Sequence, residues 1–492
     1  MNKKLYVMAM ALIAMPCLQG CDKLLEVKPD SSITEQTYFT SEADFEPYLT
    51  GIYSAMRSFA NSDLYGSQRG DEYVNGINAR LNAAVSLHQL SPSNGAADWQ
   101  PWYTAIGNCN LLLDKIQRFE FADSPNTKKR ILGETYALRA YFYFSLTRIF
   151  GKVPLMLQAV TDDNVPLLER SAETEVMKQI QSDIEASVQN FTSMTNFAKN
   201  VFPSTKYRFS YAGVQALKMD SRMWSAKVLG GGAADFNAAL AAAAEVEASG
   251  VSLNADFKNV IAVRGAANPE HILTAFFLRD EGATNFAINL MALTSTITGV
   301  INADSIVSAV SPAYAQSGYL MSPGARSWFS SAADKRIPFT YVTERRATGP
   351  TGSVWVVKHP GTRYADDRVA DNDLPVYRLA DIILLKAEAY AALGNTQNAV
   401  TELNKIRKRA GIGDYTGATD KITLETAILT ERGRELYAEN KRWYDLVRFH
   451  KGGTIDIYKF VPNLVGKTTP LYWPITITNL GKNAKLVQTE GY

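Results

Sequence analysis

Residues 376–411 read VYRLADIILLKAEAYAALGNTQNAVTELNKIRKRAG, and the spacing of their apolar side chains decides the fold class. Within residues 379–393, apolar and alanine positions recur every three or four residues, which places them on one face of a helix. Gly394 ends that helix, because glycine favours helix termini. Residues 399–410 repeat the spacing until Gly411. The stretch therefore predicts an antiparallel hairpin of two helices.

A helix pair of roughly 34 residues, with small side chains where the helices cross, has the dimensions of a tetratricopeptide unit. Such a unit cannot bury its apolar faces alone, so further helix pairs must stack against it. Helical spacing is also found at residues 41–56, 99–116, 127–150, 171–192, 210–229, 236–250 and 422–448. We therefore predict a mainly α fold, a tetratricopeptide-like scaffold of about four helix pairs.

Two long segments interrupt the helical pattern, at about residues 60–97 and 250–374. The first is rich in Gly, Asn, Ser and Asp, and the second in Gly, Ser, Thr, Pro and Asn with short apolar runs typical of strands. Loops of this length are usually functional or disordered. We interpret residues 21–492 as a single domain, in which a helical scaffold carries two irregular insertions, with a few short strands, that form a binding surface.

The N-terminus has the features of an export signal. Two lysines precede an apolar run at residues 5–18, which is too short to span a membrane as a permanent helix. Gly20 precedes Cys21, the position at which a bacterial lipoprotein signal has its acylated cysteine. We predict a signal peptide at residues 1–20 and a lipid on Cys21 that anchors the protein to a membrane. Ordinary cleavage nearby, without a lipid, is the alternative.

Composition excludes several classes of function. The chain has 51 basic and 49 acidic residues, and loss of the signal with its two lysines leaves 49 of each. A neutral chain has no electrostatic footprint for nucleic acid. After cleavage of Cys17 and acylation of Cys21, Cys109 is the cysteine left, so stability must come from packing. The four scattered histidines lack metal-ligand spacing, and we expect neither a metal nor a cofactor.

Charged residues near the C-terminus could suggest an enzyme. Glu431, Glu435 and Glu439 follow one another at a spacing of four, which places them on one face of a helix. Hydrolysis of a glycosidic bond needs two carboxylates that flank the substrate. Arg434 and Arg442, each three residues beyond a glutamate, would also keep these carboxylates ionised. We therefore predict a structural ion-pair network and no catalytic site.

Aromatic side chains in polar loops favour ligand binding instead. Sugar rings present apolar C–H faces that stack on Tyr and Trp, while Asp, Asn and Arg satisfy the hydroxyl groups. Both insertions, and the helix entrance that follows the first, supply such residues. The candidate ligand-binding residues are Asp71, Tyr73, Asn75, Arg80, Trp99, Tyr314 and Tyr319.

Several motifs in a fixed order carry a family resemblance. They include CDKLLEVKPDSSIT after the signal, SEADFEPYLTGIY, ALRAYFYFSLTRIFGKVPL, RLADIILLKAEAYAALGN, ERGRELYAENKRWYDLVR and LYWPITITNL. With these motifs the whole mature chain resembles the SusD/RagB family, the outer-membrane lipoproteins of Bacteroidetes that work beside a TonB-dependent transporter. One departure is Asn440, which stands where the family tends to have Gly.

The resemblance implies four tetratricopeptide-like helix pairs that carry an irregular ligand-binding face. It further implies a lipoprotein of the outer membrane, facing the cell exterior, that binds an oligosaccharide and delivers it to a SusC-like TonB-dependent transporter. Family members capture glycans or, in some cases, peptides, and they are not catalysts. A helical-repeat scaffold that binds only peptide or protein is the alternative function, and a glycoside hydrolase is the third.

Overall fold

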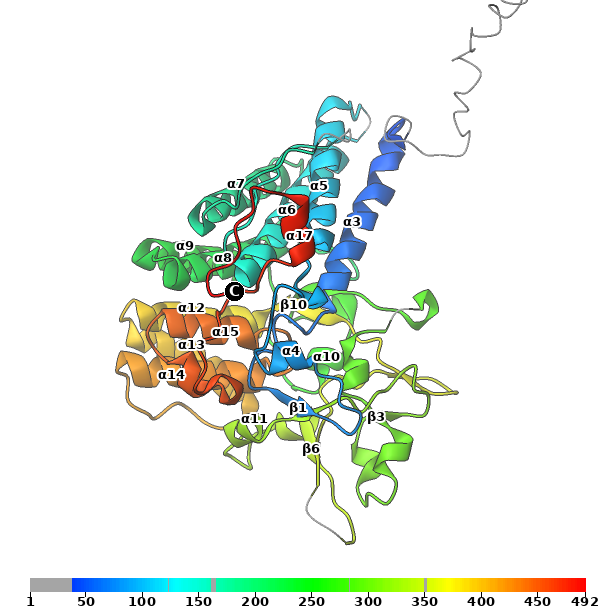
Figure 1. The fold of residues 1–492 in the computed structure, drawn as a ribbon, viewed down its shortest axis with the longest axis vertical. Helices are drawn as coiled ribbons and strands as arrows, with labels where there is room; N and C mark the ends of the chain where they lie inside the picture. The colour runs from blue at the N-terminus through cyan, green and yellow to red at the C-terminus, as the bar shows by residue number, and fades with distance from the viewer. Residues whose placement is uncertain (1–37, 123, 161–164, 283, 349–351) are drawn as a thin grey trace, which may run out of the picture.

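The computed structural model describes residues 38–122, 124–160, 165–282, 284–348 and 352–492. Its long helices form a scaffold, and irregular segments gather in a lobe at the lower right of Figure 1. The long helices are α3 (Phe45–Ala60), α5 (Gln100–Arg118), α6 (Pro125–Phe150), α7 (Glu173–Thr192), α8 (Tyr211–Val228), α9 (Gly232–Glu247), α12 (Leu379–Ala392), α13 (Thr396–Ala410), α14 (Lys421–Glu435) and α15 (Arg442–Lys451). The predicted fold class is confirmed.

Helix hairpins make up the scaffold: α6 packs on α7, α8 on α9 and α12 on α13. Helix α5 also packs on α6, and α14 packs on α12. In the α12–α13 hairpin, the side-chain oxygen of Asn395 accepts the Asn398 N–H at 3.2 Å and so caps α13. Gly394 and Gly411 both have a φ of 75°, a left-handed conformation that glycine adopts without a Cβ clash. The two glycines therefore end the helices as the sequence predicts.

The charged stretch at residues 431–448, expected as one helix, is instead split between α14 and α15. In the turn between them, Ala438 and Asn440 have φ values of 60° and 57°, outside the helical range. The start of α15 lies against the segment that follows α3, where the Trp443 N–H donates to the Gly66 carbonyl at 2.8 Å. This contact between distant segments outweighs the local helical spacing, which the sequence pattern alone could not reveal.

The lobe consists of the segments between α3 and α5 and between α9 and α12. Its strands pair two by two, β1 with β5, β3 with β4, β6 with β7 and β8 with β9, while β2 pairs with β10 at the edge of the scaffold. The strands are β1 (Tyr73–Asn75), β2 (His271–Ala275), β3 (Ala292–Leu293), β4 (Ser308–Ala309), β5 (Tyr319–Met321), β6 (Tyr341–Thr343), β7 (Val354–Val356), β8 (Thr362–Arg363), β9 (Arg368–Val369) and β10 (Leu374–Arg378). Short helices are α4 (Ala83–Ser86), α10 (Asn259–Ala262) and α11 (Pro323–Trp328) in the lobe, and α16 (Ile457–Phe460) and α17 (Ile477–Lys482) near the C-terminus.

The lobe has a hydrophobic core of its own, separate from the core of the scaffold. Phe286, Met291 and Phe329 belong to it, from the second insertion. Tyr73 joins it from the first insertion, and Tyr437 joins it from the turn between α14 and α15. Both insertions and this turn are therefore parts of one packed unit, which gives the loops of the lobe a fixed position on the scaffold.

A buried ion cluster joins the lobe to the scaffold. The Arg378 side chain is 1% exposed, and its guanidinium lies 2.6 Å from Glu270, 2.7 Å from Glu435 and 2.7 Å from Glu439. The carboxylates thus form the predicted structural network. The partner of Glu439 differs from the prediction, however, because Arg442 lies in α15 and turns to another carboxylate.

In the described part of the chain, none of the helices combines the length and the apolar character needed to cross a membrane. The same residues include no group of three or more His, Cys, Asp and Glu side chains placed to hold a metal ion. The predicted signal peptide and Cys21 lie outside the described residues.

Candidate ligand-binding face

The two insertions meet along β1 and β5, where Tyr73 lies opposite Met321. Just beyond β1, the Gly76 N–H donates to the Gly318 carbonyl at 2.7 Å. A Cβ atom on Gly76 would lie 2.3 Å from the carbonyl oxygen of Ser317. Only glycine permits this close approach, because it has no Cβ atom. The two insertions can therefore meet here only if residue 76 is glycine.

Polar side chains line the outside of this junction. The Asn78 amide donates to the Gln316 carbonyl at 2.6 Å, and the Arg80 guanidinium donates to the Gln316 side-chain oxygen at 2.8 Å. The surface, which we call the loop face, comprises the exposed residues Val74, Asn75, Ile77, Asn78 and Arg80 and the half-buried residues Tyr314 and Gln316. It combines groups that can bind hydroxyls with apolar groups that can contact the C–H face of a sugar ring.

Tyr314 supplies the aromatic ring of the loop face. The guanidinium of Arg279 lies 5.9 Å from the Tyr314 ring centroid and 4.6 Å from that of Tyr364. Arg279 also forms an ion pair with Asp366. These contacts hold Arg279 near two tyrosine rings, one of which is that of Tyr314.

The remaining predicted residues have structural partners. Tyr73 and Tyr319 are 9% and 2% exposed and stack on each other with ring centroids 5.3 Å apart. Trp99 is 5% exposed in the scaffold core. The carboxylate of Asp71 accepts two hydrogen bonds from Arg442, at 2.7 and 2.9 Å. We leave these four residues out of the loop face because other segments of the chain cover or pair with them. A polar neighbourhood in the sequence does not reveal whether a ring or a charge is covered in this way.

Sequence reasoning missed two buried carboxylates beneath the loop face. The Gln68 side-chain amide lies 2.9 Å from the Asp63 carboxylate and 2.9 Å from the Tyr319 hydroxyl. Glu72 accepts the Ala438 N–H at 2.8 Å. Burial raises the pKa of Asp63 to about 6 and that of Glu72 to about 7, because neither has an ion pair with any described residue. Both acids hold the first insertion against its neighbours.

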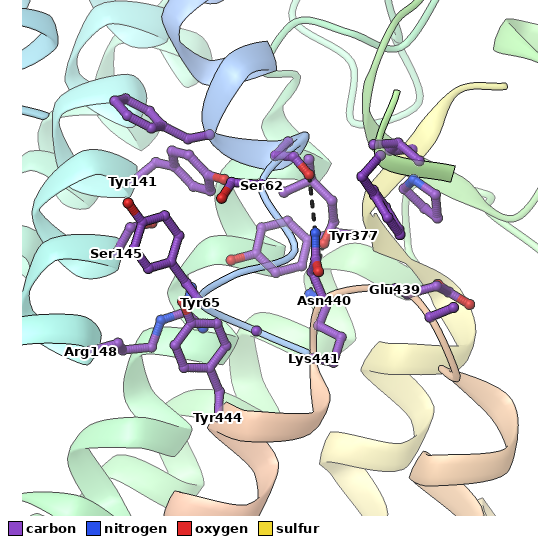
Figure 2. A pocket seen from close by; sticks show the side chains of 18 of the residues that line it. Ser62, Tyr65, Tyr141, Ser145, Arg148, Tyr377, Glu439, Asn440, Lys441 and Tyr444 are labelled. Atoms are coloured by element: carbon purple, nitrogen blue, oxygen red, sulfur yellow. Dashed lines mark hydrogen bonds between the residues drawn. The ribbon is translucent and has the colours of Figure 1, made fainter. Parts of the chain in front are cut away.

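A central cavity lies between α6 and the turn that joins α14 to α15. Figure 2 shows polar and aromatic side chains converging there, among them Ser62, Tyr65, Tyr141, Ser145, Asn440, Lys441 and Tyr444. Arg148 is held between two rings, 4.0 Å from the centroid of Phe144 and 4.1 Å from that of Tyr444, and pairs with Asp220. The cavity measures about 70 Å³. It has room for a few water molecules but falls short of the roughly 300 Å³ at which ligand pockets begin.

Comparison with known proteins identifies the family of this chain. The model of the SusD family matches residues 338–492, and a second model, described as starch-binding associating with outer membrane, matches residues 23–209. SusD-like protein P38 of Formosa agariphila is 26% identical over 100% of this chain and 99% of that protein. The chain belongs to the SusD/RagB family.

Solved structures of SusD proteins have the same architecture. NanU of Bacteroides fragilis superimposes with a TM-score of 0.79 at 28% identity, covering 95% of this chain and 100% of that one. A SusD superfamily protein from Bacteroides fragilis gives the same TM-score and identity over 92% of this chain and 100% of that one. The starch-binding protein SusD of Bacteroides thetaiotaomicron is 32% identical over 25% of this chain and 22% of that protein.

SusD/RagB proteins are carbohydrate-binding proteins associated with the outer membrane. In this member of the family, the carboxylates that could suggest an enzyme are neutralised by buried cations. Glu431 pairs with Arg336 at 2.6 Å and with Arg434 at 2.9 Å. Arginines keep Glu435 ionised: burial alone would raise its pKa, but Arg409 and Arg378 hold that pKa well below the usual range. Glu435 is therefore not poised as a proton donor.

Proposed function

We propose that this protein is a cell-surface lipoprotein that captures an oligosaccharide on the loop face and delivers it to a partner TonB-dependent outer-membrane transporter. The proposal includes a lipid on Cys21 as the membrane anchor, a position facing the cell exterior, and no catalytic activity. The loop face carries the proposal, because exposed amide, guanidinium and apolar groups lie together there on the scaffold of a glycan-binding family.

The hydrogen-bonding capacity of the loop face supports a sugar ligand. The side-chain oxygen of Asn75 accepts the Leu81 N–H at 3.1 Å, which leaves the amide NH₂ of Asn75 to donate to a ligand. Arg80 uses one guanidinium nitrogen for Gln316 and has further N–H groups that point to no described residue. Val74 and Ile77, 38% and 52% exposed, offer apolar contact beside these donors.

Binding of a panel of neutral oligosaccharides, measured by calorimetry on the chain from residue 21 onward, tests the proposal. The panel contains α- and β-linked gluco-oligosaccharides, xylo-oligosaccharides and manno-oligosaccharides. For the oligosaccharide that binds, Asn75→Ala combined with Arg80→Ala should weaken affinity at least about tenfold, because each lost hydrogen bond contributes on the order of 1 kcal/mol.

Arg118→Ala serves as the control, since its side chain is 77% exposed on the scaffold helix α5. It should leave the affinity unchanged. Affinity that survives the Asn75→Ala and Arg80→Ala changes would reject the loop face as the site. Binding of a peptide pool without any oligosaccharide would favour a peptide-binding scaffold, and release of reducing ends by the purified protein would favour a glycoside hydrolase.

A further inference from the structure

A second, larger hollow lies in the lobe, apart from the loop face. It measures about 820 Å³, within the range of pockets that bind small molecules. Helix α11 and strand β6 border it, both at the bottom of Figure 1. The residues that line this α11–β6 hollow are Asn302, Ser305, Arg326, Phe329, Ser330, Ala332, Ile337, Pro338, Tyr341, Val342 and Thr343. None of them belongs to the loop face.

Among the described residues that line this hollow, Arg326 alone carries a charge. Its guanidinium carbon lies 4.7 Å from the centroid of the Tyr341 ring, and Phe329 meets the same ring edge-on at 5.4 Å. Stacking on an aromatic face keeps the guanidinium fork in a fixed plane and leaves its N–H groups free to bind an anion. Within the described residues, the Arg326 side chain has neither a hydrogen bond nor an ion pair.

In three other hollows among the described residues, the cations of the lining are neutralised by carboxylates. In the central cavity, Arg148 pairs with Asp220 and Lys441 with Asp381. In a groove of about 380 Å³ beside α7, Arg130 and Arg208 both pair with Glu46 and Glu134. In a hollow of about 190 Å³ beside α10, Lys258 pairs with Asp256 and Lys358 with Glu439. Arg326 differs from all of these, because its positive charge borders an open hollow whose described lining includes no carboxylate.

The rest of the lining suits a saccharide. The hydroxyl groups of Ser305, Ser330 and Thr343 form no hydrogen bond with any residue that the structure describes, so they can bind the hydroxyls of a ligand. Ile337 and Val342 add half-buried apolar surface. A planar carboxylate can accept two parallel hydrogen bonds from an arginine, and a sulfate ester is bound by the same fork.

We propose that the α11–β6 hollow binds an acidic saccharide unit, with Arg326 holding its carboxylate or sulfate group. This inference rests on the proposed function, since it assigns a charged class of glycan to a protein proposed to capture oligosaccharides. The hollow would then select glycans that carry a negative charge. The loop face would bind neutral hydroxyl groups of the same glycan or of a second glycan.

Calorimetry with matched pairs of probes tests the inference on the full mature chain. The carboxylate pair is an oligogalacturonide and its fully methyl-esterified form, and the sulfate pair is a carrageenan oligosaccharide and its desulfated form. At least one acidic probe should bind about tenfold or more tightly than its neutral counterpart. Added salt should weaken that preference, because it screens the charge of Arg326.

Arg326→Gln should abolish the preference for the acidic probe, and Arg326→Lys should restore part of it, because lysine keeps the charge but loses the fork. Arg363→Gln is the matched control: Arg363 is an exposed arginine of the same lobe and does not line the hollow. Its change should leave the preference intact.

An acidic preference that persists in Arg326→Gln would overturn the inference, as would equal affinity for the acidic and neutral members of both pairs. The combined Asn75→Ala and Arg80→Ala variant separates the two proposals. If the double variant lowers the affinity for neutral oligosaccharides while Arg326→Gln has no effect on the affinity for acidic probes, the loop face is supported as a binding site and the hollow is rejected. If only Arg326→Gln lowers an affinity, namely that for the acidic probe, the hollow is supported as a binding site and the loop face is rejected.

Discussion

At the scale of a residue, Asn440 sets the turn that joins the scaffold to the lobe. Its φ of 57° lies in the left-handed region, which costs most side chains about 1–2 kcal/mol but which asparagine tolerates. The Asn440 amide also donates to the Ala60 carbonyl at 3.2 Å. Glycine adopts this conformation without strain. The conformation therefore explains why asparagine can stand where the family tends to have glycine.

Asn440→Ala should lower the free energy of unfolding by about 1–2 kcal/mol, because alanine is strained at this φ and loses the hydrogen bond to Ala60. Asn440→Gly should remain within about 1 kcal/mol of the natural protein, since relief of strain offsets the lost bond. Urea unfolding followed by circular dichroism measures both values. Equal stability of the alanine and glycine variants would show that the backbone conformation does not matter here.

At the scale of the element, the helices could be predicted because each scaffold hairpin repeats a three-to-four spacing that depends only on near neighbours. The capping residues Asn395 and Gly411 act within one helical turn, so the ends of α13 were also predictable. The break between α14 and α15 was not, because it depends on contact with Gly66, far away in the sequence. Local spacing does not encode such contacts.

The ion cluster at β10 and α14 allows a test at this scale. Arg378→Met would leave the buried carboxylates Glu270, Glu435 and Glu439 without their shared cation, and the free energy of unfolding should fall by about 3–5 kcal/mol. Arg118→Met, which removes an exposed pair with Asp114, should change it by less than about 1 kcal/mol. Urea titrations compare them, and similar losses in the two variants would refute a special role for the buried cluster.

At the scale of the whole molecule, the candidate site was predictable in part. The sequence placed Asn75, Arg80 and Tyr314 in polar insertions, and in the structure Asn75 and Arg80 are exposed and Tyr314 is half-buried. That these residues bind a ligand stays a prediction. It could not show that Tyr73 is covered by β5, because pairing between segments far apart in the chain carries no local signal. Arg326 could not be predicted for the same reason. Its position over the Tyr341 ring and its lack of a described ion-pair partner arise only in the folded molecule.

Two kinds of buried carboxylate in this molecule contribute to stability with opposite dependence on pH. Burial alone would raise the pKa of Glu439, but Arg378 and Lys358 outweigh it and lower that pKa to about 2. Glu439 therefore stabilises the fold above about pH 4.5, and this contribution is lost as the pH falls. Asp63 and Glu72 have raised pKa values, so their contribution is present at acid pH and is lost as the pH rises toward about 6 and 7.

Glu72→Gln separates these groups. The neutral amide keeps an oxygen that can accept the Ala438 N–H but carries no buried charge, so it should raise the free energy of unfolding at pH 8 by up to about 3 kcal/mol, the equivalent of the shift in pKa. At pH 4 the two proteins should be almost equally stable, because Glu72 is then protonated in the folded state and largely protonated in the unfolded state. Glu439→Gln should have the opposite sign at pH 8, since Arg378 and Lys358 lose a charged partner. Urea unfolding at both pH values measures these differences. If the Glu72→Gln variant were less stable than the natural protein at pH 8, the Glu72 carboxylate would have to be held by a cation in the folded state.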